Sequence, residues 1–517
     1  MKFLTNRRKF LGLLTSTFAW FSLSVFAQSK PPGQRRKGGQ GGGGGRGRRG
    51  AEEYVLPPEL AEFSWLSLVL GRVTDKSVTV SAVAKESIEG FFEYGTTSGN
   101  YPNKTSLLKF SANQPVEALL ENLEPNTRYY YRLQFRKTGE NDFSSRSENH
   151  FHTQRAAGSS FTFAIQGDSH PERPQMSEPN LYARTLLNAA KDKPDFYICM
   201  GDDFSVAPIR EVSFEAVAAR YTLQRPFLGM VAQSAPVFLL NGNHEQASLF
   251  NFNQTDERHA VAVHAQNARN QFFPTPAPDG FYSGDTETLP SVGLRKDYCA
   301  WTWGDALFVI LDNYWHSPAQ VDSGFREVDA GGGKGGGRGQ RDWWALTLGD
   351  AQYQWFKRTL ESSKSKYKFV FAHHVMGSGR GGIDQSEFYE WGGCGHNGTY
   401  EFKTRRPNWE LPVHQLMVKH GVTIFFQGHD HLYCKQERDG IVYQEVPMPC
   451  DHGYMTYNDE RYQSGVKLPN SGHLRMTVSS ENVQVDYVRS FLPKDETAQH
   501  KTDNVAHSYT VKARKSA

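Results

Sequence analysis

The pattern of apolar and polar positions changes character near residue 155 of the chain. Between residues 56 and 155, apolar and polar residues alternate with period two in short stretches such as 77–83 and 129–135, and turn-forming residues separate these stretches. From residue 161 onward, short continuous apolar runs alternate with segments of helical periodicity such as 181–191. The first pattern predicts an all-β sandwich, and the second predicts an α/β domain with parallel neighbouring strands.

The predicted sandwich contains a turn with a distinctive sequence. Residues 123–129 carry leucine, proline, threonine and tyrosine at alternate positions. This order resembles the corner of fibronectin type III domains, in which the tyrosine hydroxyl bonds to upstream backbone. We therefore expect residues 56–155 to form an immunoglobulin-like or fibronectin III-like sandwich. Because such modules bind many different partners, this fold alone indicates no function.

The first 27 residues have the features of an export signal. Arg7 and Arg8 precede an apolar stretch from residue 10 to 26, and residues 25–27 resemble a signal peptidase site. The segment resembles a bacterial twin-arginine signal, so the twin-arginine export machinery is an expected partner. The alternative is an uncleaved membrane anchor, but the apolar stretch is short and interrupted by polar residues. We therefore expect cleavage, no stable membrane insertion afterwards, and a periplasmic or extracellular location.

Three further segments are predicted to lie outside the packed domains. Residues 28–55 are rich in glycine, arginine and lysine, which indicates a flexible linker. Residues 331–339 repeat this composition inside the α/β domain, which we place at 160–495, and are predicted to form a flexible surface insertion. A mobile lid over a charged substrate is the alternative for this insertion. Residues 496–517 are predicted to be a mobile polar tail.

Charge and cysteine content exclude some classes of function. The net charge is only +3, which argues against nucleic acid as a stable partner. The five cysteines have irregular spacing and no Cys-x-x-Cys pair, so they indicate neither a disulfide framework nor a structural zinc site. An oxidising compartment would still permit one or two disulfide bonds.

Five short polar clusters carry the chemistry of the α/β domain. The first three directly follow predicted strands, and the carboxyl ends of neighbouring parallel strands lie at one edge of a sheet. Each cluster offers carboxylate, imidazole or carboxamide atoms, which bind divalent metals. The combination, rather than any single cluster, predicts a metal site. The clusters are Gly167-Asp168-Ser169-His170, Gly201-Asp202-Asp203, Gly242-Asn243-His244-Glu245, His373-His374 and Gly428-His429-Asp430-His431.

These clusters, in this order, resemble the calcineurin-like metallophosphoesterase superfamily over about residues 161–451. With the preceding sandwich, the chain is similar to purple acid phosphatases and alkaline phosphatase D-type enzymes. The resemblance implies a four-layer α/β (α+β) fold, in which a β-sandwich is flanked by helices. It also implies two divalent or trivalent metal ions, with zinc, manganese and iron as candidates. The implied ligands are Asp168, His170 and His431 for the first metal, Asn243, His373 and His429 for the second, and Asp202 as the bridge.

The neighbours of these ligands are assigned separate roles. His373 directly follows the predicted strand and is preferred as the ligand, which leaves His374 as the alternative ligand or as an orienting neighbour. His244 cannot easily share a metal with Asn243, so it is free to act as the general acid that protonates the leaving oxygen. Glu245 or another carboxylate is expected to orient the His244 ring.

The chain departs from the purple acid phosphatases at two positions. Those enzymes carry a metal-binding tyrosine three residues after the bridging aspartate, where this chain has Ser205. They also lack a histidine ligand at the position of His170. Because the implied first metal has no phenolate ligand, we expect a colourless or weakly coloured protein.

Substrate contacts are expected from the long segment between His374 and Gly428. Its candidates are Arg380, His396 and Asn397. An arginine side chain is well suited to bidentate contact with phosphate oxygens. Ordinary surface charge is the alternative interpretation for each of these positions.

We therefore predict an exported enzyme that hydrolyses phosphomonoesters or phosphodiesters, with a metal-activated hydroxide as the nucleophile. A nucleotidase or a phospholipase-like phosphodiesterase is a narrower form of the same hypothesis. A non-catalytic surface-binding protein is the competing class, and a degenerate ligand set would be its sign. Every implied ligand is present in this chain.

Overall fold

The structure of the chain, a computed structural model, describes residues 57–206, 209–254, 260–319, 321, 342–375 and 380–513. The predicted export signal at 1–27, the linker at 28–55 and the insertion at 331–339 lie outside the described residues. In the described part, no helix is long and apolar enough to cross a membrane.

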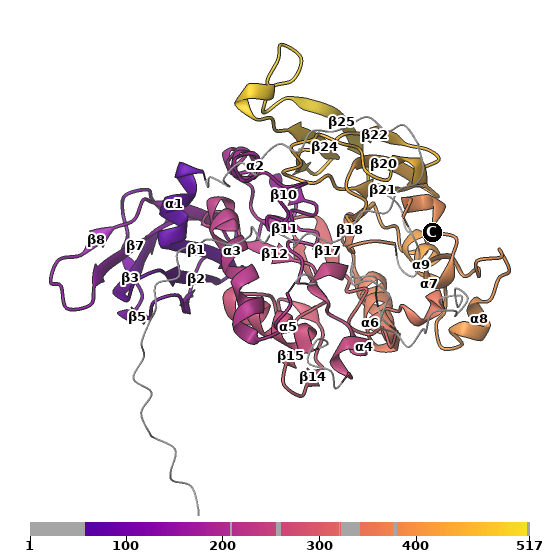
Figure 1. The fold of residues 1–517 in the computed structure, drawn as a ribbon, viewed down its shortest axis with the longest axis horizontal. Helices are drawn as coiled ribbons and strands as arrows, with labels where there is room; N and C mark the ends of the chain where they lie inside the picture. Colours follow the sequence, from indigo (N-terminus) through magenta and orange to yellow (C-terminus); the bar gives the residue numbers. More distant parts are fainter. Residues whose placement is uncertain are drawn as a thin grey trace, which may run out of the picture. The chain divides into compact units, whose positions relative to one another are not determined.

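The first described region is an all-β sandwich, coloured indigo to violet in Figure 1, which follows helix α1 (Pro58–Trp65). Its two sheets are antiparallel, and inward-facing rings such as Phe92 and Tyr131 are fully buried between them. The expected tyrosine corner is present, because the backbone N–H of Glu124 donates to the Tyr129 hydroxyl at 2.8 Å. The predicted sandwich is thus confirmed. One sheet contains β1 (Leu66–Gly71), β2 (Val78–Ala84) and β6 (Pro115–Leu120); the other contains β3 (Ile88–Gly95), β4 (Asn103–Lys104), β5 (Leu108–Phe110), β7 (Arg128–Lys137), β8 (Ser144–Ser145) and β9 (Asn149–His152).

The rest of the chain is built on two larger mixed sheets. The six-stranded sheet has the order β12 (Val237–Leu239), β11 (Tyr197–Cys199), β10 (Phe161–Gln166), β23 (Gly472–Val478), β24 (Val483–Arg489) and β25 (Val505–Val511). The eight-stranded sheet has the order β13 (Ser283–Gly284), β16 (Cys299–Trp303), β17 (Ala306–Ile310), β18 (Tyr367–Phe371), β19 (Ile424–Gln427), β21 (Ile441–Glu445), β20 (Tyr433–Arg438) and β22 (Val466–Leu468). A small separate sheet pairs β14 (Thr288–Leu289) with β15 (Gly293–Leu294).

Aromatic side chains fill the space between these two larger sheets. Phe163 of β10 meets Phe308 of β17 edge to face, with 5.1 Å between ring centroids. Trp301 of β16 stacks on Phe238 of β12 at 4.0 Å. These rings are almost completely buried, and the burial of apolar surface is the main force that holds the sheets together.

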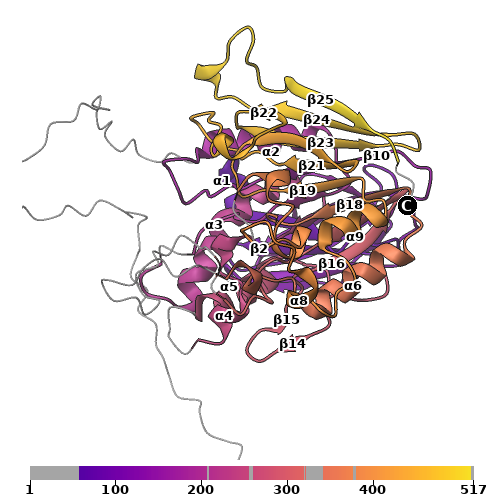
Figure 2. The ribbon, with the colours of Figure 1, turned by 90° about the vertical axis from the view of Figure 1, so that its right-hand side faces the viewer.

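Helices cover the outer faces of both sheets. Helices α2, α3 and α5 pack on the six-stranded sheet, and α6 and α9 pack on the eight-stranded sheet, where Figure 2 shows them side by side. Because both faces of the eight-stranded sheet are covered at its centre, β17 is a continuous apolar run and Lys368 is the single charged residue of β18. The predicted four-layer fold is therefore confirmed. The helices are α2 (Pro179–Lys191), α3 (Phe214–Ala232), α4 (Leu249–Phe252), α5 (Val261–Phe272), α6 (Gly349–Ser362), α7 (Tyr389–Gly392), α8 (Phe402–Arg405) and α9 (Val413–Lys419).

The parallel strands bring the five polar clusters to one edge of the two sheets. Strands β10, β11 and β12 are parallel to one another, as are β17, β18, β19 and β21. Asp168, Asp202 and Asn243 follow the carboxyl ends of β10, β11 and β12, whereas His373 and His429 follow β18 and β19. The two sheets therefore contribute side chains to a single site.

The predicted mobile tail is wrong for residues 505–511, because they form the edge strand β25 against β24. The Tyr509 hydroxyl donates to Gln444 Oε1 at 2.8 Å, and His507 Nδ1 lies 2.7 Å from the Tyr433 hydroxyl. These two contacts come from alternate residues of β25, so the segment has no continuous apolar run that could identify it as a strand.

The five cysteines are all free thiols, and four of them are buried. Burial raises the pKa of the Cys199 and Cys450 thiols far above the usual range, so these side chains behave as small apolar residues.

A buried arginine joins the sandwich to the helices of the α/β domain. In α3, Arg225 donates from Nε to Ser67 Oγ of β1 at 2.8 Å and from Nη2 to the Ser81 carbonyl of β2 at 2.6 Å. Its Nη1 donates to the Phe272 carbonyl at the end of α5. Burial lowers the pKa of Arg225 to about 9. The two regions are thus connected by a charged side chain at some energetic cost.

Candidate metal centre

Three overlapping groups of ligand-forming side chains lie at the strand ends. Within each group, the candidate ligand atoms lie within 4.8 Å of one another. Asp202 and His170 each belong to two groups, so the groups form one continuous cluster. The groups are Asp168–His170–His431, His170–Asp202–His244 and Asp202–His373–His429.

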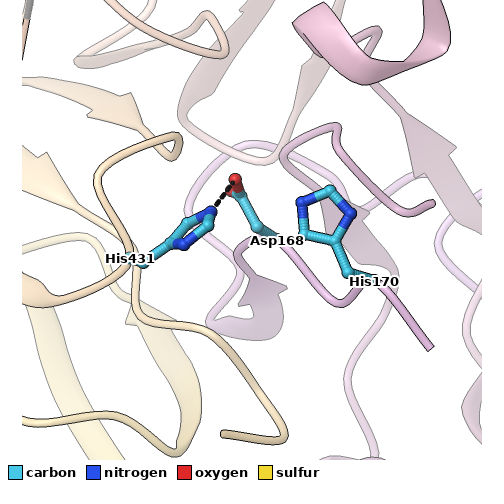
Figure 3. Close-up of side chains that lie close together, drawn as sticks. All are labelled: Asp168, His170 and His431. Carbon is cyan, nitrogen blue, oxygen red and sulfur yellow. Dashed lines mark hydrogen bonds and ion pairs between the residues drawn. The ribbon is translucent and has the colours of Figure 1, made fainter. Parts of the chain in front are cut away.

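The first group surrounds the carboxylate of Asp168 (Figure 3). His431 Nε2 lies 2.9 Å from Asp168 Oδ2, and the ring of His170 stands on the other side of this carboxylate. The second oxygen, Oδ1, accepts the backbone N–H of His429 at 2.9 Å. A Cβ at Gly428 would lie only 2.7 Å from that oxygen, so this position has no room for a side chain.

His373 connects the third group to the strand ends of the opposite sheet. Its Nδ1 donates to the Met200 carbonyl at 2.8 Å, and because a carbonyl only accepts, the hydrogen must reside on Nδ1. Its Nε2 faces Asn243 Oδ1 at 3.1 Å and Asp202 Oδ2 at 3.3 Å. Once the ring is neutral, it presents the Nε2 lone pair to the space shared with these oxygens.

Opposite charges determine the protonation of the cluster. Burial alone would raise the pKa of Asp202, but the nearby imidazoles, above all His373, outweigh it and hold the pKa well below its usual range. The same balance lowers the pKa of Asp168. Burial alone would lower the pKa of His373, but Asp202 and Asp168 outweigh it and raise the pKa to about 10. The carboxylates therefore stay ionised, and His373 must release a proton when a metal binds.

Two further observations fit a metal at this cluster. Both ring nitrogens of His170, and Nδ1 of His429, are buried without a hydrogen-bond partner in the described part of the chain. Burying unpaired polar atoms costs folding free energy unless a ligand binds to them. Positive φ angles of 41°, 51°, 77° and 59° occur at His170, Asp202, His429 and His431. Non-glycine residues in this strained region concentrate at functional sites. Carboxylate and imidazole donors suit divalent transition metals.

The sequence pattern of the calcineurin-like phosphoesterase family matches residues 161–433, which is more than half of the 517-residue chain. The chain belongs to the calcineurin-like phosphoesterase family. It is a metal-dependent phosphoester hydrolase, so the predicted superfamily and reaction class are confirmed.

The chain is similar to several solved structures, and the match to PhoD supports the fold described above. A structure of PhoD matches with a TM-score of 0.62 and 14% sequence identity, over 87% of this chain and 90% of that chain. GAP50 from Plasmodium matches with a TM-score of 0.36 and 11% identity, over 69% of this chain and 90% of that chain. The phosphopantetheinyl hydrolase PptH from Mycobacterium tuberculosis matches with a TM-score of 0.27 and 13% identity, over 56% of this chain and 91% of that chain. No curated protein matches the sequence significantly.

His244 lies beside the cluster of the phosphoesterase with one ring nitrogen directed toward it. Its Nε2 lies 3.9 Å from Asp202 Oδ2, and its Nδ1 lies 2.9 Å from Ser205 Oγ and 3.0 Å from Arg173 Nη2. Burial and the positive charge of its neighbours outweigh Asp202 and lower the pKa of His244 to about 3. The ring is therefore a neutral imidazole, with one N–H to donate.

The prediction that Glu245 orients the His244 ring is wrong. Both carboxylate oxygens of Glu245 are occupied by backbone N–H groups, from Gly242 at 2.6 Å, Asp203 at 2.9 Å and Asp202 at 3.1 Å. The contacts to the ring come instead from Ser205 and Arg173. Glu245 is a positioning residue for the loops after β11 and β12.

His374 is not a member of the three ligand groups found among the described residues. Its Nδ1 lies 2.8 Å from the Tyr314 hydroxyl, and its ring stands beside that of His429 with 4.8 Å between centroids. The geometry thus favours His373 over His374 as a ligand, and His374 supports the position of His429.

The three predicted substrate residues are separated in the structure. Arg380 borders the cluster, where its Nη1 donates to the His429 carbonyl and to Asp430 Oδ1. His396 and Asn397 lie on the exposed loop between α7 and α8, and Asn397 Oδ1 accepts the backbone N–H of a residue of the same loop. The hydrogen bond of Asn397 stays within its own loop, and neither residue belongs to the three ligand groups. The geometry therefore does not support His396 and Asn397 as substrate contacts.

Sequence reasoning missed two residues at the centre of the phosphoesterase. Arg173 lies three residues after His170, and this short spacing could have placed it near the cluster. The role of the Met200 carbonyl could not be found in this way, because the main chain of any residue at that position would offer the same oxygen.

Proposed function

We propose that this phosphoesterase uses two metal ions bridged by Asp202. The observation that carries the proposal is the reach of one carboxylate oxygen. Asp202 Oδ2 lies 3.3 Å from His373 Nε2 and 3.8 Å from His170 Nε2, so it faces ligand candidates from both sheets. On one side stand Asp168, His170 and His431, and on the other stand Asn243, His373 and His429.

Hydrolysis forms a P–O bond to water, breaks the ester P–O bond and places a proton on the leaving oxygen. Bound metal ions supply the activation of water and neutralise charge on the phosphate. The ionised carboxylates of Asp168 and Asp202 hold the cations. The buried ring of His373 is fixed by Met200, and the neutral ring of His244 offers an N–H to the substrate oxygens.

Zinc, manganese and iron are the candidate metals for this donor set. Ser205 occupies the position at which purple acid phosphatases carry a metal-binding tyrosine. Its Oγ contacts the His244 ring. This contact supports a centre without a phenolate ligand, and the absence of a strong visible absorption band from iron-loaded protein would agree with it.

The proposal of two metal ions is tested by comparing substitutions at two aspartates, one in the cluster and one in the sandwich. Purified protein is stripped with a chelator, reloaded with zinc, manganese or iron, and analysed by mass spectrometry for metal content. We expect about two ions per active wild-type chain, and Asp202→Asn should lose both metal and hydrolysis of a chromogenic phosphoester. Asp75→Asn, in the β1–β2 turn of the sandwich, should retain both. A fully active wild type with one ion per chain would contradict the proposal.

We also propose that the enzyme works outside the cytoplasm. The support is the sequence of residues 1–27, with Arg7 and Arg8 ahead of an apolar stretch. Mass spectrometry of protein exported by a bacterial host should find a mature chain that begins near Gln28. The double variant Arg7→Lys, Arg8→Lys should accumulate inside the cell, and an exported chain that retains residue 1 would contradict cleavage.

A further inference from the structure

The candidate ligands are unequally exposed, and the difference indicates where a substrate reaches them. The side chains of His170 and His373 are fully buried. The side chains of His431 and His244 are 12% and 14% exposed. The solvent side of the cluster is therefore the side on which His431 and His244 stand.

Two arginines border the cluster, and they differ in how closely a carboxylate approaches them. Arg380 Nη1 donates to the His429 carbonyl and lies 3.0 Å from the buried carboxylate of Asp430. Arg173 places Nη2 3.0 Å from His244 Nδ1. Its Nε lies 3.5 Å from the buried carboxylate of Glu172, and its side chain is 21% exposed. Of the two, Arg173 is held less tightly by its carboxylate.

Arg173 also retains hydrogen-bonding capacity. Its charged neighbour Glu172 lies 3.5 Å from Nε, which is longer than the 2.7–2.9 Å of a charge-assisted hydrogen bond. The same Glu172 oxygen already accepts the backbone N–H of Ser205 at 2.7 Å. Nη1 has no hydrogen-bond partner among the described residues. Because a guanidinium carries its donors in a planar fork, this end can receive an oxyanion.

The backbone ties Arg173 to the metal cluster. Its N–H donates to the carbonyl of His170 at 2.9 Å, and its own carbonyl accepts the N–H of Ser177 at 2.9 Å. The turn that carries the guanidinium thus begins at a candidate metal ligand. A residue held in this way is positioned before the substrate arrives, which lowers the entropic cost of binding.

We propose that Arg173 binds the terminal phosphate of a phosphomonoester and gives this enzyme its preference for monoesters over diesters. The inference rests on the proposed function. A monoester phosphate carries nearly two negative charges at neutral pH and three free oxygens. It can give two oxygens to the guanidinium and keep a third for the cluster. A diester has one negative charge and two free oxygens, so it cannot satisfy both partners in this way.

The test uses the metal-loaded enzyme and the variant Arg173→Met, which keeps side-chain length and removes the charge. We expect KM for 4-nitrophenyl phosphate to rise about 10- to 100-fold, the usual value of hydrogen bonds to a charged group. KM for bis(4-nitrophenyl) phosphate should change about threefold or less, and kcat for each ester should stay within about threefold of wild type. Arg173→Lys should recover part of the monoester affinity, because it restores the charge but not the fork.

A binding measurement makes the test independent of catalysis. Calorimetric titration with inorganic phosphate should show the same 10- to 100-fold loss of affinity in Arg173→Met, at unchanged metal content. Arg136→Met, at a sandwich arginine that is 25% exposed, is the matched control and should bind phosphate as wild type does. Equal KM changes for both esters, or unchanged phosphate affinity in Arg173→Met and Arg173→Lys, would overturn the role of Arg173. If the loaded wild type hydrolyses neither ester, the proposed function fails, and phosphate affinity alone then decides the role of Arg173.

Discussion

The chain contains two β-sandwiches that differ in strand direction, and only one of them carries a metal-ligand cluster in the described residues. In the amino-terminal sandwich, all recorded strand pairs are antiparallel. In the catalytic sandwich, β10–β11–β12 and β17–β18–β19–β21 run parallel. Antiparallel strands send successive turns to opposite ends, whereas parallel strands collect their carboxyl ends at one edge.

The two sandwiches also differ in what covers them. β7 of the first sandwich alternates buried and half-buried residues, because its outer face has no helix layer. Strand β18 is buried along its whole length, because α6 and α9 lie on its outer face. A fully covered sheet edge can hold charged side chains away from water, which strengthens their interactions. Strand direction and coverage together account for where the cluster forms.

The largest expected effect separates two histidines that share a hydrogen-bond pattern. His373 Nδ1 donates to the Met200 carbonyl, and His152 Nδ1, in the first sandwich, donates to the Thr153 carbonyl at 2.6 Å. His373→Ala should lower kcat about 10³-fold, because it removes a candidate ligand of the metal that stabilises transition-state charge. His152→Ala should leave kcat per folded molecule unchanged. Steady-state kinetics with metal analysis measures kcat and metal content in both variants. An equal loss of kcat in the two variants would contradict the restriction of catalysis to the second sandwich.

A smaller effect is expected at the joint between the two sandwiches. Arg225→Met leaves the carbonyls of Ser81 and Phe272 without their donor, which should cost about 2 kcal/mol of unfolding free energy after relief of the buried charge. Urea denaturation should then show the first sandwich unfolding before the catalytic domain. Arg136→Met, at a half-buried ion pair of β7, is the control. An unchanged single transition in Arg225→Met would show that the guanidinium does not couple the regions.

The smallest effect is confined to the first sandwich. Tyr129→Phe removes the acceptor of the Glu124 N–H and should cost about 1 kcal/mol of stability without changing catalysis. Tyr130→Phe, on the adjacent half-buried position, should change the urea midpoint less. A loss of phosphoesterase activity in Tyr129→Phe would mean that the first sandwich contributes to the site.

The sequence predicted the cluster well because its residues lie within a few positions of strand ends. Asp168 follows β10 almost directly and His373 follows β18, so local apolar runs were sufficient to place them. Glu245 was misassigned, because its partners are backbone groups from another strand end, and backbone groups leave no trace in residue type. The strand β25 was missed because alternate positions pair with distant Tyr433 and Gln444. Such partners become visible only after the chain has folded.

Glu245 couples the positions of the two loops that carry Asp202 and Asn243. One carboxylate accepts N–H groups from the loop after β11 and from the loop after β12, and these loops carry Asp202 and Asn243. The backbone N–H of His244 adds a second link between these loops, because it donates to Asp202 Oδ1 at 2.8 Å. The spacing between the Asp202 carboxylate and the Asn243 carboxamide is therefore set when the protein folds, before any ion arrives. Because this spacing is fixed in advance, it favours cations whose size matches it.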